Sequence, residues 1–235
     1  MSRICTICAR GGSKGVKNKN IKLIVGKPLI AHSILQAKAS GLFDVIAVSS
    51  DSQEILQAAM EYGADIVVER PVELATDTAA KLPVIQHCVR EVEKQTGLSF
   101  DVMTDIDATS PLRTVGDLKN SVELLENHER ATNLITGAPS RRSPYFNLVE
   151  QDTNGFVRLS KELPAAIVRR QDAPKSFDMN ASIYVWKRES FFKEASIFTP
   201  TTVLYEMPEE RSVDIDSELD FEFVSFLAEK RGTLL

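Results

Sequence analysis

Strand-like and helix-like segments alternate through the first half of this 235-residue chain, and this alternation constrains the fold more than any other feature. Apolar runs typical of buried strands cover residues 3–9, 44–50, 64–70 and 101–108. Segments with helical periodicity follow them at residues 28–41, 52–63, 81–95 and 115–127. The pattern predicts an α/β fold with a single Rossmann-like, mostly parallel sheet and helices on both faces. In such folds, ligands bind outside the carboxyl ends of the strands.

The overall composition is that of an ordinary globular chain, with 43% hydrophobic and 26% charged residues. The formal net charge of −5 argues against nucleic acid as a partner. No apolar run approaches the roughly 18 residues of a spanning helix, so we expect no membrane segment. Met1 leads directly into the first expected strand, and the three cysteines form no disulfide framework. We therefore expect a cytoplasmic protein without a signal peptide.

The second half of the chain has a different rhythm. Residues 138–178 are rich in proline and arginine and predict an excursion from a single domain that covers residues 1–235, with a hairpin around Asn154-Gly155. Strands are expected at 181–186 and 201–207, and a final helix at 217–230. Because all three histidines fall within expected helices, we assign none of them to catalysis. The pair Cys5 and Cys8 is expected in the core rather than at a zinc site, since residues three apart on a strand face opposite sides.

The loop after the first strand, ARGGSKGVKNKN at residues 9–20, gathers Arg10, Lys14, Lys17 and Lys19 around three glycines. Backbone N–H groups of a glycine-rich turn can cradle phosphate oxygens, and the basic side chains supply the countercharge. The glycine spacing fits neither the P-loop nor the dinucleotide-binding motif. The loop therefore predicts a phosphate site of another type, and the alternative is a solvated turn.

Two aspartates near the end of the chain, Asp214 and Asp216, flank Ile215 in an expected extended segment. Alternate residues of a strand project to the same side, so the two carboxylates suit Mg²⁺, which prefers oxygen ligands and retains water and substrate phosphates. Taken alone, the pattern favours a simpler interpretation in which Asp216 or Ser217 caps the final helix. The other motifs of the chain shift the preference to a metal site.

Four motifs, in order, resemble those of the acylneuraminate cytidylyltransferases, the CMP-sialic acid synthetases. They are ARGGSKGVKNKN, RPVELATDTA (70–79), TSPLRT (109–114) and SVDIDSELD (212–220), and the resemblance runs from residue 4 to about residue 224. It implies a fold of the nucleotide-diphospho-sugar transferase type. The implied reaction transfers CMP from CTP to the anomeric hydroxyl of a nonulosonic acid and releases pyrophosphate. It also implies Mg²⁺ as cofactor and a homodimer in which the excursion at 138–178 serves dimerisation and reaches the partner's site.

The resemblance assigns roles to residues that match its motifs. Nucleotide binding falls on Ala9, Arg10, Gly11, Gly12, Ser13, Lys14, Asn20, Arg70 and Asp77, and Asp77 has an equal alternative as a helix cap. Sugar binding falls on Asp107, Thr109, Arg170, Gln171 and Asn180, with Arg170 pairing with the acid's carboxylate. Catalysis falls on Arg10, Lys14, Lys19, Asp107, Asp214 and Asp216, and the last two are the metal ligands.

The chain departs from the family pattern at two places. Asp107 stands where the family has a glutamine near the sugar, and it could serve as a third metal-associated carboxylate, serve as a base for the sugar hydroxyl, or repel the sugar's carboxylate. Ala80 and Lys81 stand where relatives often have serines near the base, so cytosine selectivity would rest more on Arg70 and backbone groups. Two other functions stay open: nucleotidyl transfer to another sugar, such as an octulosonate or a hexose phosphate, and CTP sensing without catalysis. The sugar itself, of sialic, legionaminate or pseudaminate type, is not named by the sequence.

Overall fold

The computed structural model describes residues 1–164, 169–232 and 234. Its central sheet contains β1 (Arg3–Cys8), β4 (Val45–Ser50), β5 (Ile66–Glu69), β6 (Val102–Ile106), β7 (Asn133–Pro139), β10 (Phe177–Lys187) and β11 (Thr202–Glu206). The strand order is β11-β7-β10-β6-β1-β4-β5. Strand β10 runs antiparallel to its neighbours β6 and β7, and the other pairs are parallel. The predicted mostly parallel sheet is confirmed.

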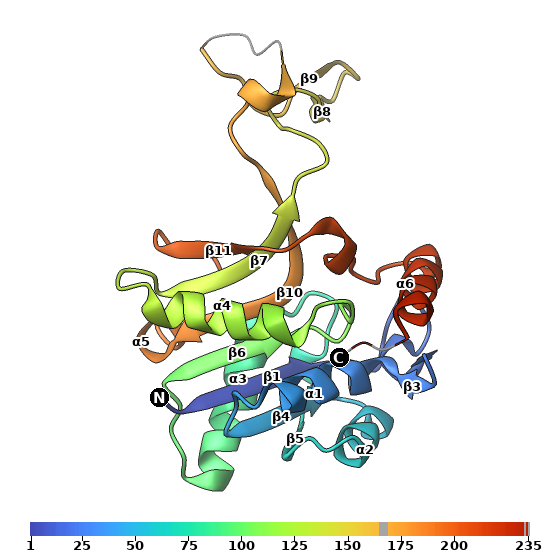
Figure 1. The fold of residues 1–235 in the computed structure, drawn as a ribbon, viewed down its shortest axis with the longest axis vertical. Helices are drawn as coiled ribbons and strands as arrows, with labels where there is room; N and C mark the ends of the chain where they lie inside the picture. Colours follow the sequence, from blue (N-terminus) through green and yellow to red (C-terminus); the bar gives the residue numbers. More distant parts are fainter. Residues whose placement is uncertain (165–168, 233, 235) are drawn as a thin grey trace.

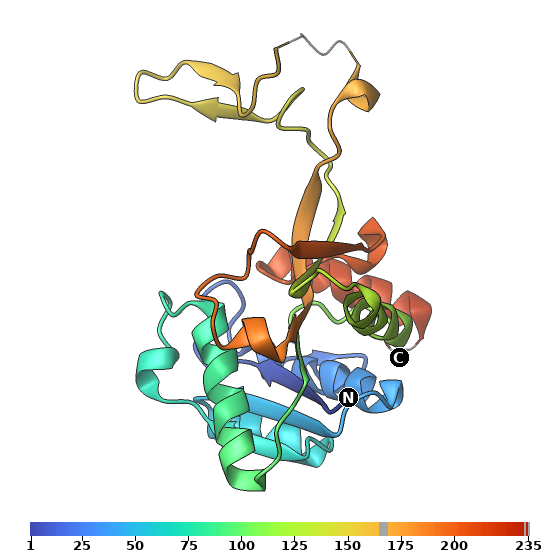
Figure 2. The ribbon, with the colours of Figure 1, turned by 90° about the vertical axis from the view of Figure 1, so that its left-hand side faces the viewer.

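Helices cover both faces of this sheet (Figures 1 and 2). The α-helices of the described structure are α1 (Leu29–Ser40), α2 (Gln53–Glu61), α3 (Lys81–Thr96), α4 (Val115–Asn127), α5 (Arg188–Phe191) and α6 (Glu218–Arg231). Short 3-10 helices lie at η1 (Lys19–Ile21), η2 (Val72–Leu74), η3 (Arg170–Asp172) and η4 (Glu209–Arg211). Helices α1, α2 and α4 share one apolar core with the sheet, whereas α3 and α5 pack on the opposite face.

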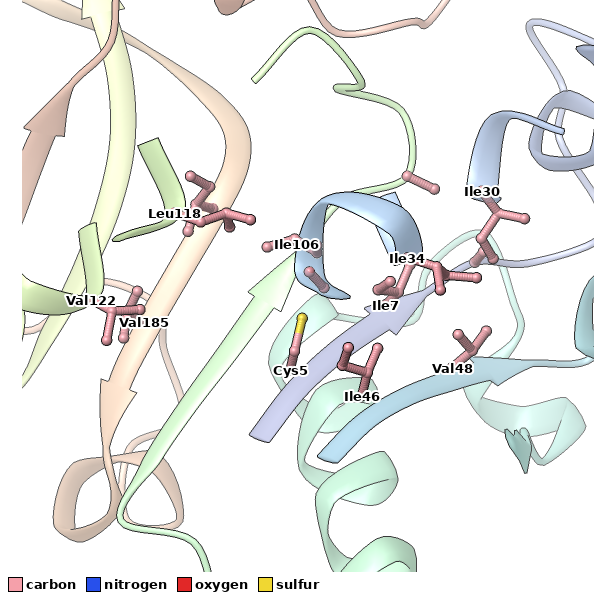
Figure 3. Close-up of a cluster of buried hydrophobic side chains, with 14 of the residues drawn as sticks. Cys5, Ile7, Ile30, Ile34, Ile46, Val48, Ile106, Leu118, Val122 and Val185 are labelled. Atoms are coloured by element: carbon pink, nitrogen blue, oxygen red, sulfur yellow. The ribbon is translucent and has the colours of Figure 1, made fainter. Parts of the chain in front are cut away.

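Successive side chains of β1 point to opposite faces of the sheet, so this strand contributes to both apolar cores. Cys5 and Ile7 are buried with the α1 residues Ile30 and Ile34 (Figure 3). Cys8 instead packs against the core beneath α3, so the two cysteines face opposite sides as a strand requires. Both thiols are free, and Cys8 is only half-buried.

Helix α6 packs at the edge of the molecule, beside the hairpin of β2 (Leu23–Ile24) and β3 (Lys27–Pro28) (Figure 1). It begins with a capping box, in which the Ser217 hydroxyl accepts from the Asp220 backbone N–H and the Asp220 carboxylate accepts from that of Ser217. Lys22, directly before the hairpin, lies 2.7 Å from the Glu218 carboxylate. The capping box fixes the chain directly after the Asp214–Asp216 segment.

Between β7 and β10 the chain leaves the sheet and forms a projecting arm, whose described residues are 140–164 and 169–176 (Figures 1 and 2). The arm carries a hairpin of β8 (Val149–Gln151) and β9 (Val157–Leu159), and the turn contains Gly155 with φ of +88°. The hairpin predicted around Asn154-Gly155 is confirmed. Phe156 and Val157 are exposed at its tip, with 74% and 64% of their surface accessible.

Three features of the fold differ from the expectations. Strand β7 was not predicted, because Gly137 and Pro139 read as turn residues in the sequence; a Cβ on Gly137 would lie 2.9 Å from the Asp178 carbonyl oxygen across the ladder. Helix α5 and the β2–β3 hairpin are too short for a periodicity to show. His128 follows the end of α4, where its ring accepts from the Ala131 N–H at 3.0 Å.

Among the described residues, no helix is long and apolar enough to cross a membrane.

Candidate active site

A cleft of about 410 Å³ opens at the carboxyl ends of β1 and β6. Its size lies within the range of small-molecule sites. The cleft brings together most of the residues that the sequence predicts for the site: Ala9, Arg10, Ser13, Lys14, Lys19, Asn20, Arg70, Asp77, Asp107, Thr109, Asp214 and Asp216. It is also lined by Cys8, Gly15, Leu74, Thr76, Ala79, Lys81 and Val84, which were not predicted as site residues.

The basic loop at 9–20 is held by specific hydrogen bonds. The Gly11 N–H donates to the Asp51 carboxylate at 2.9 Å, and the Asn20 side-chain amide donates to the Arg10 carbonyl at 3.0 Å. Gly11 and Gly12 do not line the cleft; the space around Gly12 is open, with no atom within 4 Å of an added Cβ. The loop is therefore an ordered turn that carries its basic side chains at the end of β1.

The basic loop touches the Asp214–Asp216 segment directly. A Cβ on Gly15 would lie 1.8 Å from the Asp216 carbonyl oxygen, so only glycine allows this approach of the two backbones. The Lys19 ammonium donates to the Ile215 carbonyl and lies 3.9 Å from the Asp216 carboxylate. Positive and negative charges from opposite ends of the chain thus meet at one side of the cleft.

The acidic pair is arranged with one half-buried and one exposed carboxylate. Asp214 has a buried Oδ1 with no hydrogen-bond partner, whereas the Asp216 side chain is 83% exposed. Burial, followed by the negative charge of Asp107, raises the pKa of Asp214 despite a hydrogen bond from Thr109. Ser217 caps α6, so both carboxylates remain available.

This donor set fits a hard divalent cation, because carboxylate oxygens are the ligands that Mg²⁺ takes from proteins. The buried Oδ1 of Asp214, which accepts no hydrogen bond, is suited to contact a positive group. Within residues 1–164, 169–232 and 234, no three histidine, cysteine or carboxylate side chains converge on one point. Asp214 and Asp216 would hold such an ion together with water or phosphate oxygens.

Asp77 faces the basic loop rather than a helix end. Its carboxylate pairs with the Arg10 guanidinium at 2.7 Å and with the Lys14 ammonium. The hydrogen bond from Lys14, together with that from Arg10, lowers the pKa of Asp77. Helix α3 is preceded by Ala80, so the helix-cap alternative for Asp77 does not apply.

Arg70 lies on the opposite wall of the cleft, directly after β5. Only 6% of its surface is exposed, and its guanidinium donates to the Ser49 carbonyl at 2.8 Å and to the Ser49 hydroxyl at 3.3 Å. These bonds anchor the planar group at the end of β4. Contact of Arg70 with a pyrimidine or a ribose stays a prediction.

The residue at the family's glutamine position, Asp107, is paired with Lys81. The Lys81 ammonium lies 2.7 Å from the Asp107 carboxylate and 3.4 Å from that of Asp105. Asp107 also accepts from the Thr109 backbone N–H at 3.1 Å and hydroxyl at 2.9 Å. Burial alone would raise the pKa of Asp107, but Lys81 and Thr109 outweigh it and lower this pKa to about 2. A carboxylate this weakly basic fits a hydrogen-bond acceptor better than a general base.

The remaining sugar-binding predictions lie elsewhere. Asn180 is buried, and its amide oxygen accepts from the Thr136 hydroxyl at 2.6 Å while its nitrogen donates to the Ser212 hydroxyl at 2.9 Å. Gln171 lines a separate hollow of about 400 Å³ on the arm. The side chain of Arg170 is outside the described part of the structure. Contact of these three residues with a sugar stays a prediction.

The chain has the fold of a nucleotidyltransferase, with a glycine-rich basic loop facing an acidic pair. A solved structure of CMP:2-keto-3-deoxy-manno-octonic acid synthetase complexed with CTP shares the fold, with a TM-score of 0.69 at 16% identity, covering 98% of this chain and all of that one. The family model described as cytidylyltransferase matches residues 4–234, and the chain belongs to this family. The prediction of a cytidylyltransferase is confirmed.

Two curated relatives are similar over nearly their whole length. The CMP-N,N'-diacetyllegionaminic acid synthase of Campylobacter jejuni is 48% identical over 224 residues, which cover 95% of this chain and 94% of the relative. The post-translational flagellin modification protein B of Campylobacter coli is 45% identical over 229 residues, which cover 97% of this chain and 96% of the relative.

Proposed function

We propose that the enzyme transfers CMP from CTP to the anomeric hydroxyl of a nonulosonic acid of the legionaminate type and releases pyrophosphate. The observation that most supports this reaction is the contact between the basic loop and the acidic pair in one cleft, at Gly15 and Lys19. The 48% identity to a CMP-N,N'-diacetyllegionaminic acid synthase supports this sugar class over the others that the sequence left open.

Each group of side chains in the cleft has its own role in this reaction. Arg10, Lys14 and Lys19 neutralise the triphosphate and the leaving pyrophosphate, since preorganised cations stabilise charge that moves onto a leaving group. Arg70, anchored at Ser49, holds the pyrimidine nucleoside against its wall. Thr109 and Asp107 orient the sugar so that its anomeric oxygen approaches the α-phosphate in line.

Mg²⁺ is the proposed cofactor, held by Asp214 and Asp216. When bound, it would supply positive charge at the phosphate and help the sugar hydroxyl lose its proton. The unpartnered Oδ1 of Asp214 supports this assignment. Asp77 keeps Arg10 and Lys14 in place before the nucleotide arrives, because it pairs with both.

The test is pyrophosphate release with CTP, Mg²⁺ and one nonulosonic acid per reaction. The panel consists of N,N'-diacetyllegionaminate, a pseudaminate-type acid, N-acetylneuraminate and an octulosonate. We expect kcat/KM to be highest for the legionaminate-type acid and no release without an acid. Preference for the octulosonate would reassign the sugar, and CTP binding without release with any acid would favour a CTP-sensing protein.

We also propose a homodimer in which the arm reaches the site of the partner. The exposed apolar side chains of the arm, Phe156 and Val157, support burial against a second copy. Gln171 of the arm lies outside the cleft of its own chain and would then serve the partner's cleft.

Mixing inactive variants tests this shared site. Homodimers of Gln171→Ala or of Asp214→Asn are expected to be nearly inactive. Mixed dimers made by unfolding and refolding both together would regain about a quarter of the wild-type activity, since half the dimers are mixed and each holds one intact site. No recovery, or a monomer in light scattering, would contradict the shared site.

The free thiols of the chain support a reducing compartment, and we propose the cytoplasm.

A further inference from the structure

Lys81 is the charged residue of the cleft that the proposed mechanism leaves without a role. It is the first residue of α3, whose first turn contains no acidic residue. A cation at a helix N-terminus is unfavourable, because the helix dipole places positive charge there. A residue that breaks a local rule at a binding site indicates a compensating role.

Asp105 of β6 and Asp107, which follows the end of that strand, provide the compensation. The Lys81 ammonium lies 2.7 Å from the Asp107 carboxylate and 3.4 Å from that of Asp105. It also lies 4.5 Å from the centre of the Tyr184 ring, which is buried and stacks on Trp186. Tyr184 and Asp105 are direct partners in the β10–β6 ladder, so the ammonium rests on two adjacent strands.

Asp107 is held on its other side by Thr109, which leaves it one defined orientation. Its Oδ1 accepts from the Thr109 N–H and hydroxyl, and its Oδ2 accepts from Lys81. About a quarter of each side chain, 23% for Asp107 and 25% for Lys81, is exposed to the cleft. The carboxylate therefore has one fixed orientation in the lining of the cleft, beside Thr109, which also contacts Asp214.

The resemblance leads us to expect other residues at both positions of this pair, and in the structure Lys81 and Asp107 form one ion pair. An isolated carboxylate at position 107 would repel the sugar's own carboxylate. A carboxylate neutralised by Lys81 would not, while it still accepts a hydrogen bond from an amide N–H or hydroxyl.

We propose that Lys81 is a positioning residue for the sugar: it fixes and neutralises Asp107 so that this carboxylate reads an N–H or O–H donor of the nonulosonic acid. The inference rests on the proposed function and adds the element that selects the sugar. In this arrangement Lys81 acts through Asp107, whereas the triphosphate is met by Arg10, Lys14 and Lys19. The pair therefore affects the KM for the acid and leaves the KM for CTP nearly unchanged.

The experiment is a double-mutant cycle of Lys81→Met and Asp107→Asn, with kcat and both KM values measured. Lys81→Met leaves two carboxylates without a countercharge, so we expect the KM for the acid to rise about 100-fold, and about 10-fold in Asp107→Asn. The double variant is expected near 10-fold, far below the product of the single effects, because no unpaired carboxylate then faces the acid: Asp105, which loses its countercharge, is buried and does not line the cleft. It also keeps the test valid where Lys81→Met alone does not fold.

Lys22→Met is the matched control, since Lys22 makes the same kinds of contact outside the cleft. Its ammonium lies 2.7 Å from Glu218 and 4.1 Å from the centre of the Phe221 ring. We expect unchanged KM values for both substrates in this variant.

An unchanged KM for the acid in Lys81→Met, an equal rise in the KM for CTP, single effects that multiply, or the same change in Lys22→Met would each overturn the inference alone. Wild-type enzyme that releases no pyrophosphate with any nonulosonic acid would overturn the proposed function as well.

Discussion

Gly15→Ala is expected to inactivate the enzyme by moving the basic loop away from the acidic pair. An added Cβ would lie 1.8 Å from the Asp216 carbonyl oxygen, and real Cβ atoms essentially never approach below 3.0 Å, so the two backbones must separate by about 1.2 Å. Lys19 loses its place at the Ile215 carbonyl in the process. A displacement of about 1 Å at a reacting centre costs on the order of 100-fold in rate.

The assay is the rate of pyrophosphate release at saturating CTP and acid, together with the midpoint of thermal unfolding. Gly12→Ala is the matched control in the same loop, because nothing lies within 4 Å of its added Cβ. We expect kcat of Gly15→Ala to fall about 100-fold with a small change in unfolding midpoint, since Gly15 is exposed. Equal activity of the two variants would refute the claim that the loop and the acidic pair must touch.

Three further outcomes follow from the contacts. Lys14→Ala should lower kcat about 100- to 1,000-fold without destabilising the protein, since this side chain is 78% exposed; an unchanged turnover would remove Lys14 from catalysis. Asp214→Asn should abolish any rise in the thermal unfolding midpoint that Mg²⁺ causes. Its midpoint without metal should equal or exceed that of the wild type, because the Asp214 Oδ1 has no hydrogen-bond partner to lose. A midpoint that still rises with Mg²⁺ would contradict the metal site. Asp117→Asn should lower the free energy of unfolding by about 2–4 kcal/mol, as Arg211 pairs with this buried carboxylate at 2.9 Å. Burial raises the pKa of Asp117, but Arg211 and Thr114 outweigh it, so the net pKa is lowered. The stabilisation is therefore present above about pH 4 and is lost as the pH falls further. Chemical denaturation at pH 7 and pH 3 should show that the difference in free energy of unfolding between variant and wild type is smaller at pH 3.

Much of the architecture could be predicted because each layer has its own local signal. The strands at the start of the chain are short apolar runs, and the helices between them have clear periodicity and end signals such as Gly41. Strand β7 has no such signal, since Gly137 and Pro139 suggest a turn. The requirement for Gly137 comes from a neighbouring strand, which no local pattern reveals.

The site could be predicted only where motifs carry it. The basic loop and the Asp214–Asp216 pair were found as separate motifs, but their contact at Gly15 joins residues from opposite ends of the chain. In the same way, Lys81 and Asp107 were noticed as two departures, and their pairing depends on the first residue of α3 lying beside the chain that follows β6. The signal that was available for Lys81 is a lysine at the start of a helix, where the dipole disfavours it.

The most direct test of CMP transfer is to follow the CMP conjugate itself by mass spectrometry, with CTP and N,N'-diacetyllegionaminate as substrates and Mg²⁺ present. We expect the CMP-linked acid to accumulate in step with pyrophosphate in the wild type and to be nearly absent in Asp214→Asn. Accumulation of the conjugate at wild-type rate in Asp214→Asn, or pyrophosphate release without any conjugate, would contradict it.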